Sequence, residues 1–190
     1  MHCATASADD IIIAAVDAAR RGAPSMEAAL DELPAPIYTT DAEGRITFFN
    51  RACIAFAGRT PVIGEDRWCV TWKLYNENGT PLPHESCPMA VAIREKRAVR
   101  GVEAIAERPD GTRVSLRPYP TPLLDDEGEV VGAVNMLIDV TGRKQAERLK
   151  SEARRCRRLA QGINDPRTIN TLRLMAGEYE AKARALVLVN

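Results

Sequence analysis

Residues Pro34 to Asn50, PAPIYTTDAEGRITFFN, carry the clearest structural pattern in the sequence. Residues 37–40 and 46–49 are rich in the β-branched and aromatic side chains that favour strands. The DAEG between them ends in glycine, which tolerates a positive φ and is typical of a tight turn. So short a polar connection predicts an antiparallel hairpin. Because an isolated hairpin is only marginally stable in water, the remaining chain must supply further strands and a covering layer.

The chain after the hairpin carries alternating helical and strand patterns. RACIAFAG has apolar residues at helical spacing, the proline-rich residues 59–85 predict an irregular loop, and Ser86 and Pro88 predict the start of a second helix. Three further strand candidates, residues 99–107, 113–124 and 130–140, are separated by Asp/Gly turns. Two strands, a helical insert and three strands predict an α+β fold, a five-stranded antiparallel sheet with helices on one face.

Three prolines in the fourth strand candidate predict a local break in pairing. Pro118, Pro120 and Pro122 alternate, so one edge of the strand loses three successive backbone donors. We therefore expect the second half of this strand to pair only with the strand that follows it.

Helical segments flank the expected sheet domain. We divide the chain into an N-terminal helical arm (1–24), the sheet domain (25–141) and a C-terminal helical extension (142–190). In the extension, Asn164-Asp165-Pro166 separates two helices, which should fold back as an antiparallel pair or pack in a dimer. Surplus apolar faces on both arms predict a homodimer or partner interface, which would use Ile12, Val16, Ala19, Leu172, Tyr179 and Leu186.

Composition limits the partners and the compartment. Twenty-six basic and 26 acidic residues cancel, so no global field favours nucleic acid or membrane. The arginines at 154, 155, 157 and 158 wrap around their helix instead of forming one stripe, which also argues against nucleic acid. Five scattered cysteines predict free thiols in a reducing compartment, and no apolar run reaches membrane length. We expect a cytoplasmic protein.

Two segments of the chain resemble the PAS family of sensory domains. PIYTTDAEGRITFFNRACIAFAG is similar to the opening of a PAS domain, and VVGAVNMLIDVTGRKQAERL is similar to its last strand, Asp-x-Thr junction and exit helix. The resemblance covers residues 26–149 and implies a PAS-like five-stranded sheet with helices on one face. It also implies that Asp139 and Thr141 couple the sheet to the exit helix. Alternatively, these two residues simply cap that helix.

A ligand, if one binds, should lie between the sheet and the middle helices. The large apolar residues expected to line this space are Phe48, Trp68, Trp72, Met89, Ile93, Leu116 and Met136. A filled core made of the same residues is the alternative. His84 and Cys87-Pro88 resemble elements of haem-binding PAS proteins, although loop and capping roles explain them as well. The Asn-Cys-Arg-Phe motif of photoreactive flavin domains does not occur, and the cofactor stays open.

Signatures of enzymes and of metal sites do not occur in the sequence. It contains no GxxxxGK[ST], GxSxG or HExxH motif, and two histidines cannot form an extensive ligand set. We therefore expect a non-enzymatic sensory or adaptor protein that signals through contacts with a partner protein, with a small-molecule ligand left open. A haem or redox sensor using His84 or Cys87 and a small pocket enzyme are the alternatives.

Overall fold

The computed structural model describes residues 28, 30–31 and 33–188. The expected N-terminal arm, with Ile12, Val16 and Ala19, lies outside the described residues. Contacts divide the chain into two compact units, Met1–Asp139 and Val140–Asn190, and each is described by itself.

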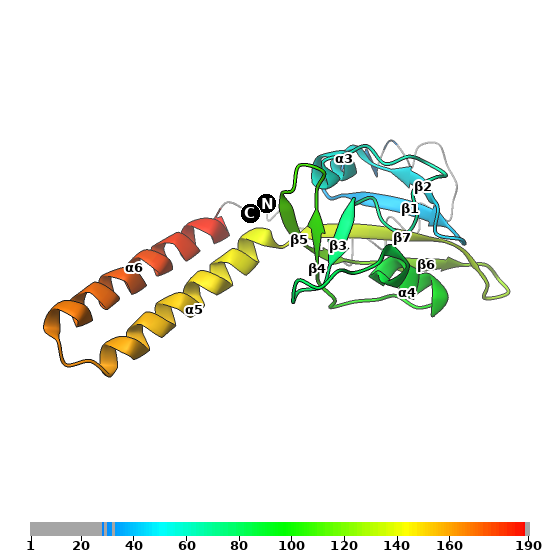
Figure 1. Cartoon of the computed structure of the whole chain (residues 1–190). Helices are drawn as coiled ribbons and strands as arrows, with labels where there is room; N and C mark the ends of the chain where they lie inside the picture. The colour runs from blue at the N-terminus through cyan, green and yellow to red at the C-terminus, as the bar shows by residue number, and fades with distance from the viewer. Residues whose placement is uncertain (1–27, 29, 32, 189–190) are drawn as a thin grey trace, which may run out of the picture. The chain divides into compact units, whose positions relative to one another are not determined.

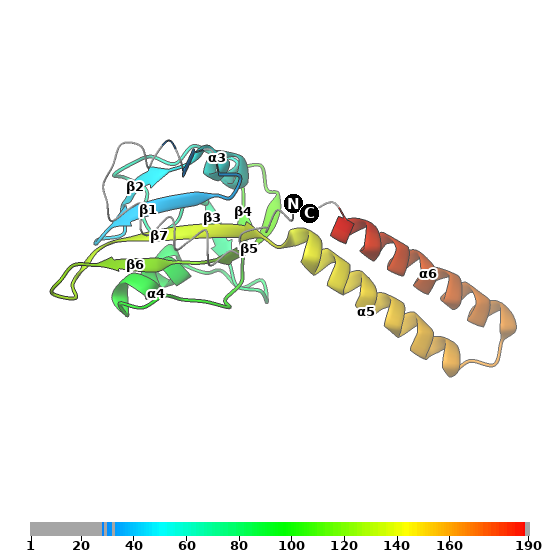
Figure 2. The same ribbon diagram turned by 180° about the vertical axis from the view of Figure 1, so that it is seen from behind.

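The first unit is built on one antiparallel sheet (Figure 1). Its strands run in the order β2-β1-β7-β5-β4-β3, and β6 pairs with β7 beside this path. Seen from behind, β7 lies between β1 and β6 (Figure 2). The strands are β1 (Ile37–Asp41), β2 (Ile46–Phe49), β3 (Lys73–Tyr75), β4 (Ala104–Glu107), β5 (Arg113–Pro118), β6 (Thr121–Leu124) and β7 (Val130–Asp139).

The expected hairpin is formed by β1 and β2, and a helix follows it directly. Asp41 closes the turn by accepting a hydrogen bond from the backbone N–H of Arg45 at 2.7 Å. Asn50 then caps α3 (Arg51–Ala57), because its side chain accepts from the backbone N–H of Cys53. Gly58 ends the helix with φ 64°, a left-handed conformation that favours glycine.

Two features raise the strand number above the five expected. The short strand β3 lies in the segment predicted to be a loop, where pairing with β4 rather than local sequence makes it extended. The prolines divide the fourth strand candidate into β5 and β6. Among the described strands β6 pairs only with β7, as predicted, whereas β5 pairs with both β4 and β7.

Helices cover one face of the sheet. The 3-10 turn η1 (His84–Ser86) leads into α4 (Pro88–Arg94), which begins with Pro88 as expected, although Cys87 rather than Ser86 holds the N-cap position. The main hydrophobic core lies on this face and includes side chains from α3 and α4. A second, smaller core lies around Ile37 and Met136 and includes Leu30 and Leu123.

The second unit is an antiparallel helical hairpin of α5 (Thr141–Gln161) and α6 (Pro166–Leu188). Asp165 caps α6 by accepting from the backbone N–H of Thr168 at 2.8 Å. Small side chains at the seam, Ala153, Cys156 and Ala176, allow the two helices to approach closely. The predicted fold-back of these helices is thus present. No helix among the described residues combines the length and apolar character needed to cross a membrane.

Candidate functional site

The interior of the first unit contains a chain of buried polar groups. Asn135 of β7 donates from Nδ2 to the hydroxyl of Tyr38 on β1 at 2.9 Å, and that hydroxyl donates to the carbonyl of Trp68 at 2.9 Å. The other amide atom, Oδ1, accepts from the backbone N–H of Tyr119 at 2.9 Å. Asn135 is 2% exposed and Tyr38 is fully buried, so these bonds are shielded from water.

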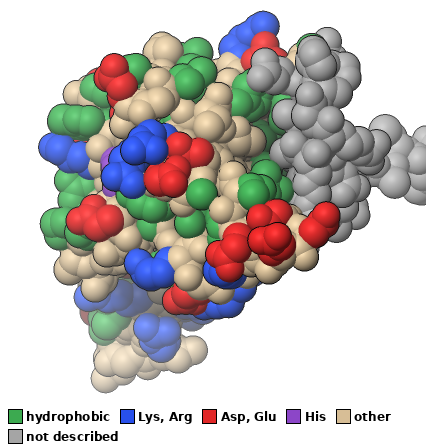
Figure 3. Space-filling model, turned by 90° about the vertical axis from the view of Figure 1, so that its right-hand side faces the viewer, with side chains coloured by type: hydrophobic (Ala, Val, Ile, Leu, Met, Phe, Trp, Pro, Cys, Tyr) green, Lys and Arg blue, Asp and Glu red, His purple; other side chains and the backbone are tan. Residues whose placement is uncertain are grey.

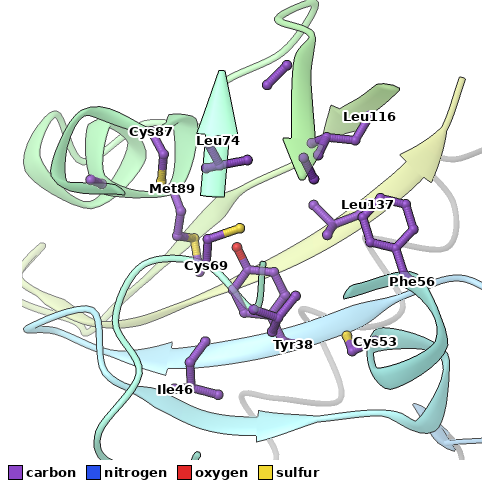
Figure 4. Packing of buried hydrophobic residues seen from close by; sticks show 14 of the residues in the cluster. Tyr38, Ile46, Cys53, Phe56, Cys69, Leu74, Cys87, Met89, Leu116 and Leu137 are labelled. Atoms are coloured by element: carbon purple, nitrogen blue, oxygen red, sulfur yellow. The ribbon is translucent and has the colours of Figure 1, made fainter. Parts of the chain in front are cut away.

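Two thiols lie beside this polar chain. In Figure 4 the hydroxyl of Tyr38 points from β1 toward Cys69 and Met89, and Cys87 lies above them. Burial raises the pKa of the Cys87 thiol to about 12 and holds the pKa of Tyr38 well above its usual value. Cys87 and Tyr38 therefore stay protonated at neutral pH, and the neutral Tyr38 hydroxyl accepts one hydrogen bond and donates another.

The space between these side chains is nearly filled. A cavity of about 10 Å³ lies among Tyr38, Cys69, Cys87, Asn135 and their neighbours. Pockets for drug-sized ligands enclose roughly 300–1,000 Å³, and a single water needs about 10–15 Å³. In this conformation the interior is a packed core with a polar centre. A flavin or haem would bind there only after side chains move.

Trp68 links this interior to the β1–β2 turn. Its backbone has φ 68°, which is strained for a tryptophan, while its N–H donates to the carbonyl of Gly44 at 2.7 Å. Gly44 itself has φ 80°, and a Cβ at this position would lie 2.1 Å from the indole ring of Trp68. Only glycine allows this close approach. The β1–β2 turn thereby holds Trp68 in place, and the carbonyl of Trp68 accepts the hydrogen bond from Tyr38.

The predicted lining residues separate into different environments. Met89 and Leu116 line the small cavity, Ile93 belongs to the same core, and Trp68 packs against that core. Phe48 and Met136, in contrast, belong to the second core. Their assignment to the pocket was wrong because alternate strand residues point to opposite faces, and here Phe49 and Leu137 take the inner positions.

Trp72 also departs from the expectation, since the residue is 42% exposed. It lies beside a surface groove of about 390 Å³, which it lines together with Tyr75, Leu82 and His84 among others. The ammonium group of Lys73 lies 3.9 Å from the centre of the indole ring. Trp72 directly precedes β3, which is the last strand in the order of the sheet, so this side chain lies at the sheet edge.

His84 and Cys87 do not converge on one site. His84 lines the surface groove, whereas Cys87 lines the interior cavity. The Nε2 atom of His84 is buried and has no hydrogen-bond partner among the described residues, and burial lowers the pKa of the imidazole. A ferric iron would require a thiolate from Cys87, and burial opposes that form. Among the described residues, no group of three or more His, Cys, Asp or Glu side chains could hold a metal ion.

The junction between the two units is short. Strand β7 ends at Asp139, which pairs with Leu116 of β5, and α5 begins at Thr141. The N-cap position belongs to Val140, whose side chain makes no capping bond, so neither Asp139 nor Thr141 occupies it. A single residue thus separates the long strand of the polar chain from the exit helix.

The predicted partner face on α6 is partly occupied within the hairpin. Leu172 and Tyr179 pack against the seam formed by Ala153, Cys156 and Ala176. They are therefore not surplus apolar residues, since the adjacent helix covers them in part. Within the described part of this unit, the large apolar residues that stay exposed are Leu159, Leu174, Met175 and Val187.

Sequence reasoning missed Tyr38, Cys69 and Asn135 as members of the interior site. One signal was present, because Asn135 interrupts the apolar run VVGAVNMLIDV, and a polar residue in a strand buried on both faces needs an internal partner. The identity of that partner could not be read, since Tyr38 lies 97 residues away.

Several solved structures are similar to this chain. The structure of an RNA-binding light-oxygen-voltage receptor matches 63% of this chain at 21% identity with a TM-score of 0.48, and the match spans 33% of that receptor. A light-oxygen-voltage protein of Rhodobacter sphaeroides matches 84% of this chain and 92% of its own at 14% identity, TM-score 0.43. The PAS domain of the fruit-fly ELK potassium channel matches 62% of this chain and 95% of its own at 13% identity, TM-score 0.45.

A comparison with curated proteins found no match. A family model described as the PAS fold matches residues 30–145, which is more than half of the sequence. The match covers the sheet, both covering helices and the first turn of α5. The chain therefore belongs to the PAS fold family, whose fold implies a role in sensing signals.

Proposed function

We propose that this protein is a cytoplasmic, non-enzymatic sensory adaptor that passes its signal through the α5–α6 hairpin by contact with a partner. The observation that carries the proposal is the direct connection from Asn135, at the centre of the polar chain, along β7 to α5. Only Val140 lies between the strand and the helix. A change in the bonding of Asn135 would shift β7, and this shift would reach α5, which begins two residues after the strand ends.

The chemistry of the interior supports a binding role over a catalytic one. Cys53 and Cys87 are buried thiols whose pKa is raised to about 12, and the Tyr38 hydroxyl is protonated. A nucleophile or general base needs a pKa near the working pH. The polar groups of the interior instead form a chain of hydrogen bonds, and a bound ligand or a movement of an adjacent residue could rearrange it.

Hydrogen exchange of the full-length chain tests the coupling. The Tyr38→Phe variant removes the central hydroxyl, and we expect faster amide exchange both in β7 and in the first turns of α5. Tyr75→Phe, at the surface groove, is the matched control and should leave α5 unchanged. Faster exchange in β7 with unchanged α5 would show that the units are uncoupled and would contradict the proposal.

An absorption spectrum of the freshly purified protein separates this proposal from its rivals. A haem or flavin band would replace the adaptor with a cofactor-based sensor, for which the interior would have to open. We expect a spectrum with protein absorption alone.

The adaptor is proposed to work as a homodimer through the apolar side of the hairpin. Leu159 and Met175 are 50% and 39% exposed and lie on different helices of the same pair. Replacing both by Gln should shift sedimentation toward the monomer, whereas Leu174→Gln, which changes another exposed apolar residue, should not. A wild-type monomer at tens of micromolar would end this part of the proposal.

A further inference from the structure

The two units of the chain carry opposite net charges. Residues 140–190 contain twelve Lys and Arg against five Asp and Glu, a net charge of +7. Residues 1–139 contain fourteen against twenty-one, a net charge of −7. The net charge of the whole chain is zero, but the helical hairpin by itself is strongly basic. By contrast, Figure 3 shows acidic, basic and apolar side chains interspersed on one side of the molecule.

Helical periodicity places many of these cations in two stripes. In α5, Arg143, Lys150, Arg154 and Arg157 follow one another at intervals of seven, four and three residues, which keeps them on one side of a helix. In α6, Arg173, Glu180 and Arg184 follow at intervals of seven and four. Each helix thus presents one charged stripe along its length.

One ion pair shows that the two stripes lie on the same side of the hairpin. The guanidinium of Arg157 donates to the carboxylate of Glu180 at 2.9 Å across the two helices. Because each of these residues belongs to its own stripe, the stripes are neighbours. We call the resulting surface the basic face, which consists of Arg143, Lys150, Arg154, Arg157, Arg173 and Arg184.

Most of the cations on the basic face have no internal counter-ion. Arg157 pairs with Glu180, and Arg143 pairs with Glu147 at 2.7 Å. The other four, which are Lys150, Arg154, Arg173 and Arg184, form no ion pair within the described residues and are exposed. Unpaired like charges at this density repel one another, so an anionic ligand on this face would lower the free energy.

The composition of the face indicates the kind of anion. The centre of a protein–protein interface is depleted in charged residues and enriched in aromatic residues and Met. Leu159 follows Arg157 by two positions, and Met175 follows Arg173 by two positions. Two positions turn the helix by about 200°, so both apolar residues lie on the side of the hairpin opposite the basic face. Val187 follows Glu180 by seven positions, so it is an apolar residue at one end of the α6 stripe. A membrane-bound helix likewise needs apolar side chains beside its cations. Nucleic-acid interfaces, in contrast, are polar and strongly positive.

We propose that the basic face binds the sugar-phosphate backbone of nucleic acid without reading its sequence. Arg143 to Arg157 span about 21 Å of helix, over which a duplex offers one phosphate per about 1.7 Å. Five of the six cations are arginines, whose planar guanidinium suits bidentate contact with phosphate. The sequence argued against nucleic acid because the α5 arginines encircle their helix. The contribution of α6 to the same side supplies the continuous surface that α5 alone lacks.

Fluorescence anisotropy of the full-length chain with labelled double-stranded DNA and single-stranded RNA tests the inference between about 50 and 200 mM salt. The test variant carries Lys150→Gln, Arg154→Gln, Arg173→Gln and Arg184→Gln. The control carries Arg148→Gln, Arg155→Gln, Arg167→Gln and Lys182→Gln, which removes the same charge from other sides of the helices. Gln has nearly the helix propensity of Arg and Lys, and circular dichroism of both variants checks that the hairpin is intact.

We expect wild-type binding to at least one nucleic acid with a log–log salt slope of about −0.9 per phosphate contacted. The test variant should bind at least about tenfold more weakly, with a slope flatter by about 3, while the control stays within about threefold. Equal weakening in both variants would overturn the assignment to this face. So would a lack of binding at low salt, or binding to poly-glutamate or anionic phosphatidylserine vesicles as tight as to nucleic acid. A preference between the DNA and RNA probes would identify the natural backbone.

Discussion

Replacing Tyr38 by Phe should destabilise the first unit although it changes a single atom. The ring keeps its volume and its packing on β1, so no cavity is expected. The hydroxyl, however, makes two hydrogen bonds at 2.9 Å, to Nδ2 of Asn135 and to the carbonyl of Trp68. In the variant, Nδ2 of Asn135 and the carbonyl of Trp68 each lose the hydrogen bond to the Tyr38 hydroxyl.

The magnitude follows from the burial of those partners. A buried polar group that loses its partner costs about 1–3 kcal/mol. Asn135 is 2% exposed and keeps one bond through Oδ1, and the Trp68 carbonyl keeps a long contact of 3.9 Å from the Cys87 thiol. We therefore expect the free energy of unfolding to fall by about 2–4 kcal/mol.

Urea unfolding followed by tryptophan fluorescence measures this loss, because both tryptophans belong to the first unit. Tyr75→Phe serves as the control and should change the free energy of unfolding by less than about 1 kcal/mol. A loss below about 0.5 kcal/mol in Tyr38→Phe would refute the view that this polar chain is closed to water.

Three further changes test other parts of the structure. Gly44→Ala should lower the free energy of unfolding by about 3 kcal/mol or more, because its Cβ would overlap the ring of Trp68. Gly79→Ala is the control: Gly79 also has a positive φ, 85°, but has open space around it, so this variant should lose only about 1 kcal/mol. The midpoints of urea unfolding compare the two variants. Trp72→Ala should cost less than about 1 kcal/mol in melting experiments, since the side chain is 42% exposed, and a loss of several kcal/mol would restore it to the core. Burial lowers the pKa of His84 from 6.5, so the unfolded chain takes up the proton first and stability should fall as pH drops below about 6.5. His84→Gln should flatten that part of the pH profile, and an unchanged profile would remove His84 as its cause.

Local sequence determined most of the secondary structure of the first unit. Strand-forming residues around a Gly-ended turn were enough to place β1 and β2, and Asn50 and Gly58 marked both ends of α3. The alternating prolines also predicted that β6 would pair with β7 alone, because a missing N–H acts at its own position. These features depend on interactions between residues that are close in sequence.

Tertiary structure alone decided which face of each strand meets the helices. Alternation groups Val134 with Met136 and Asn135 with Leu137, but it does not say which pair lies under α4. Phe48 and Met136 were misplaced for this reason. Strand β3 was missed on similar grounds, since three residues carry little pattern and pairing with β4 makes them extended.

Tertiary structure also decides almost all of the candidate site. Its central bond joins Asn135 to a residue 97 positions earlier, and the Trp68 carbonyl reaches it from a loop held by Gly44. The basic face likewise needs cations from two helices, which a single helical wheel cannot combine. Sequence specifies propensities and caps because those energies are local, whereas hydrogen bonds and charge surfaces formed across the chain exist only once distant segments are brought together.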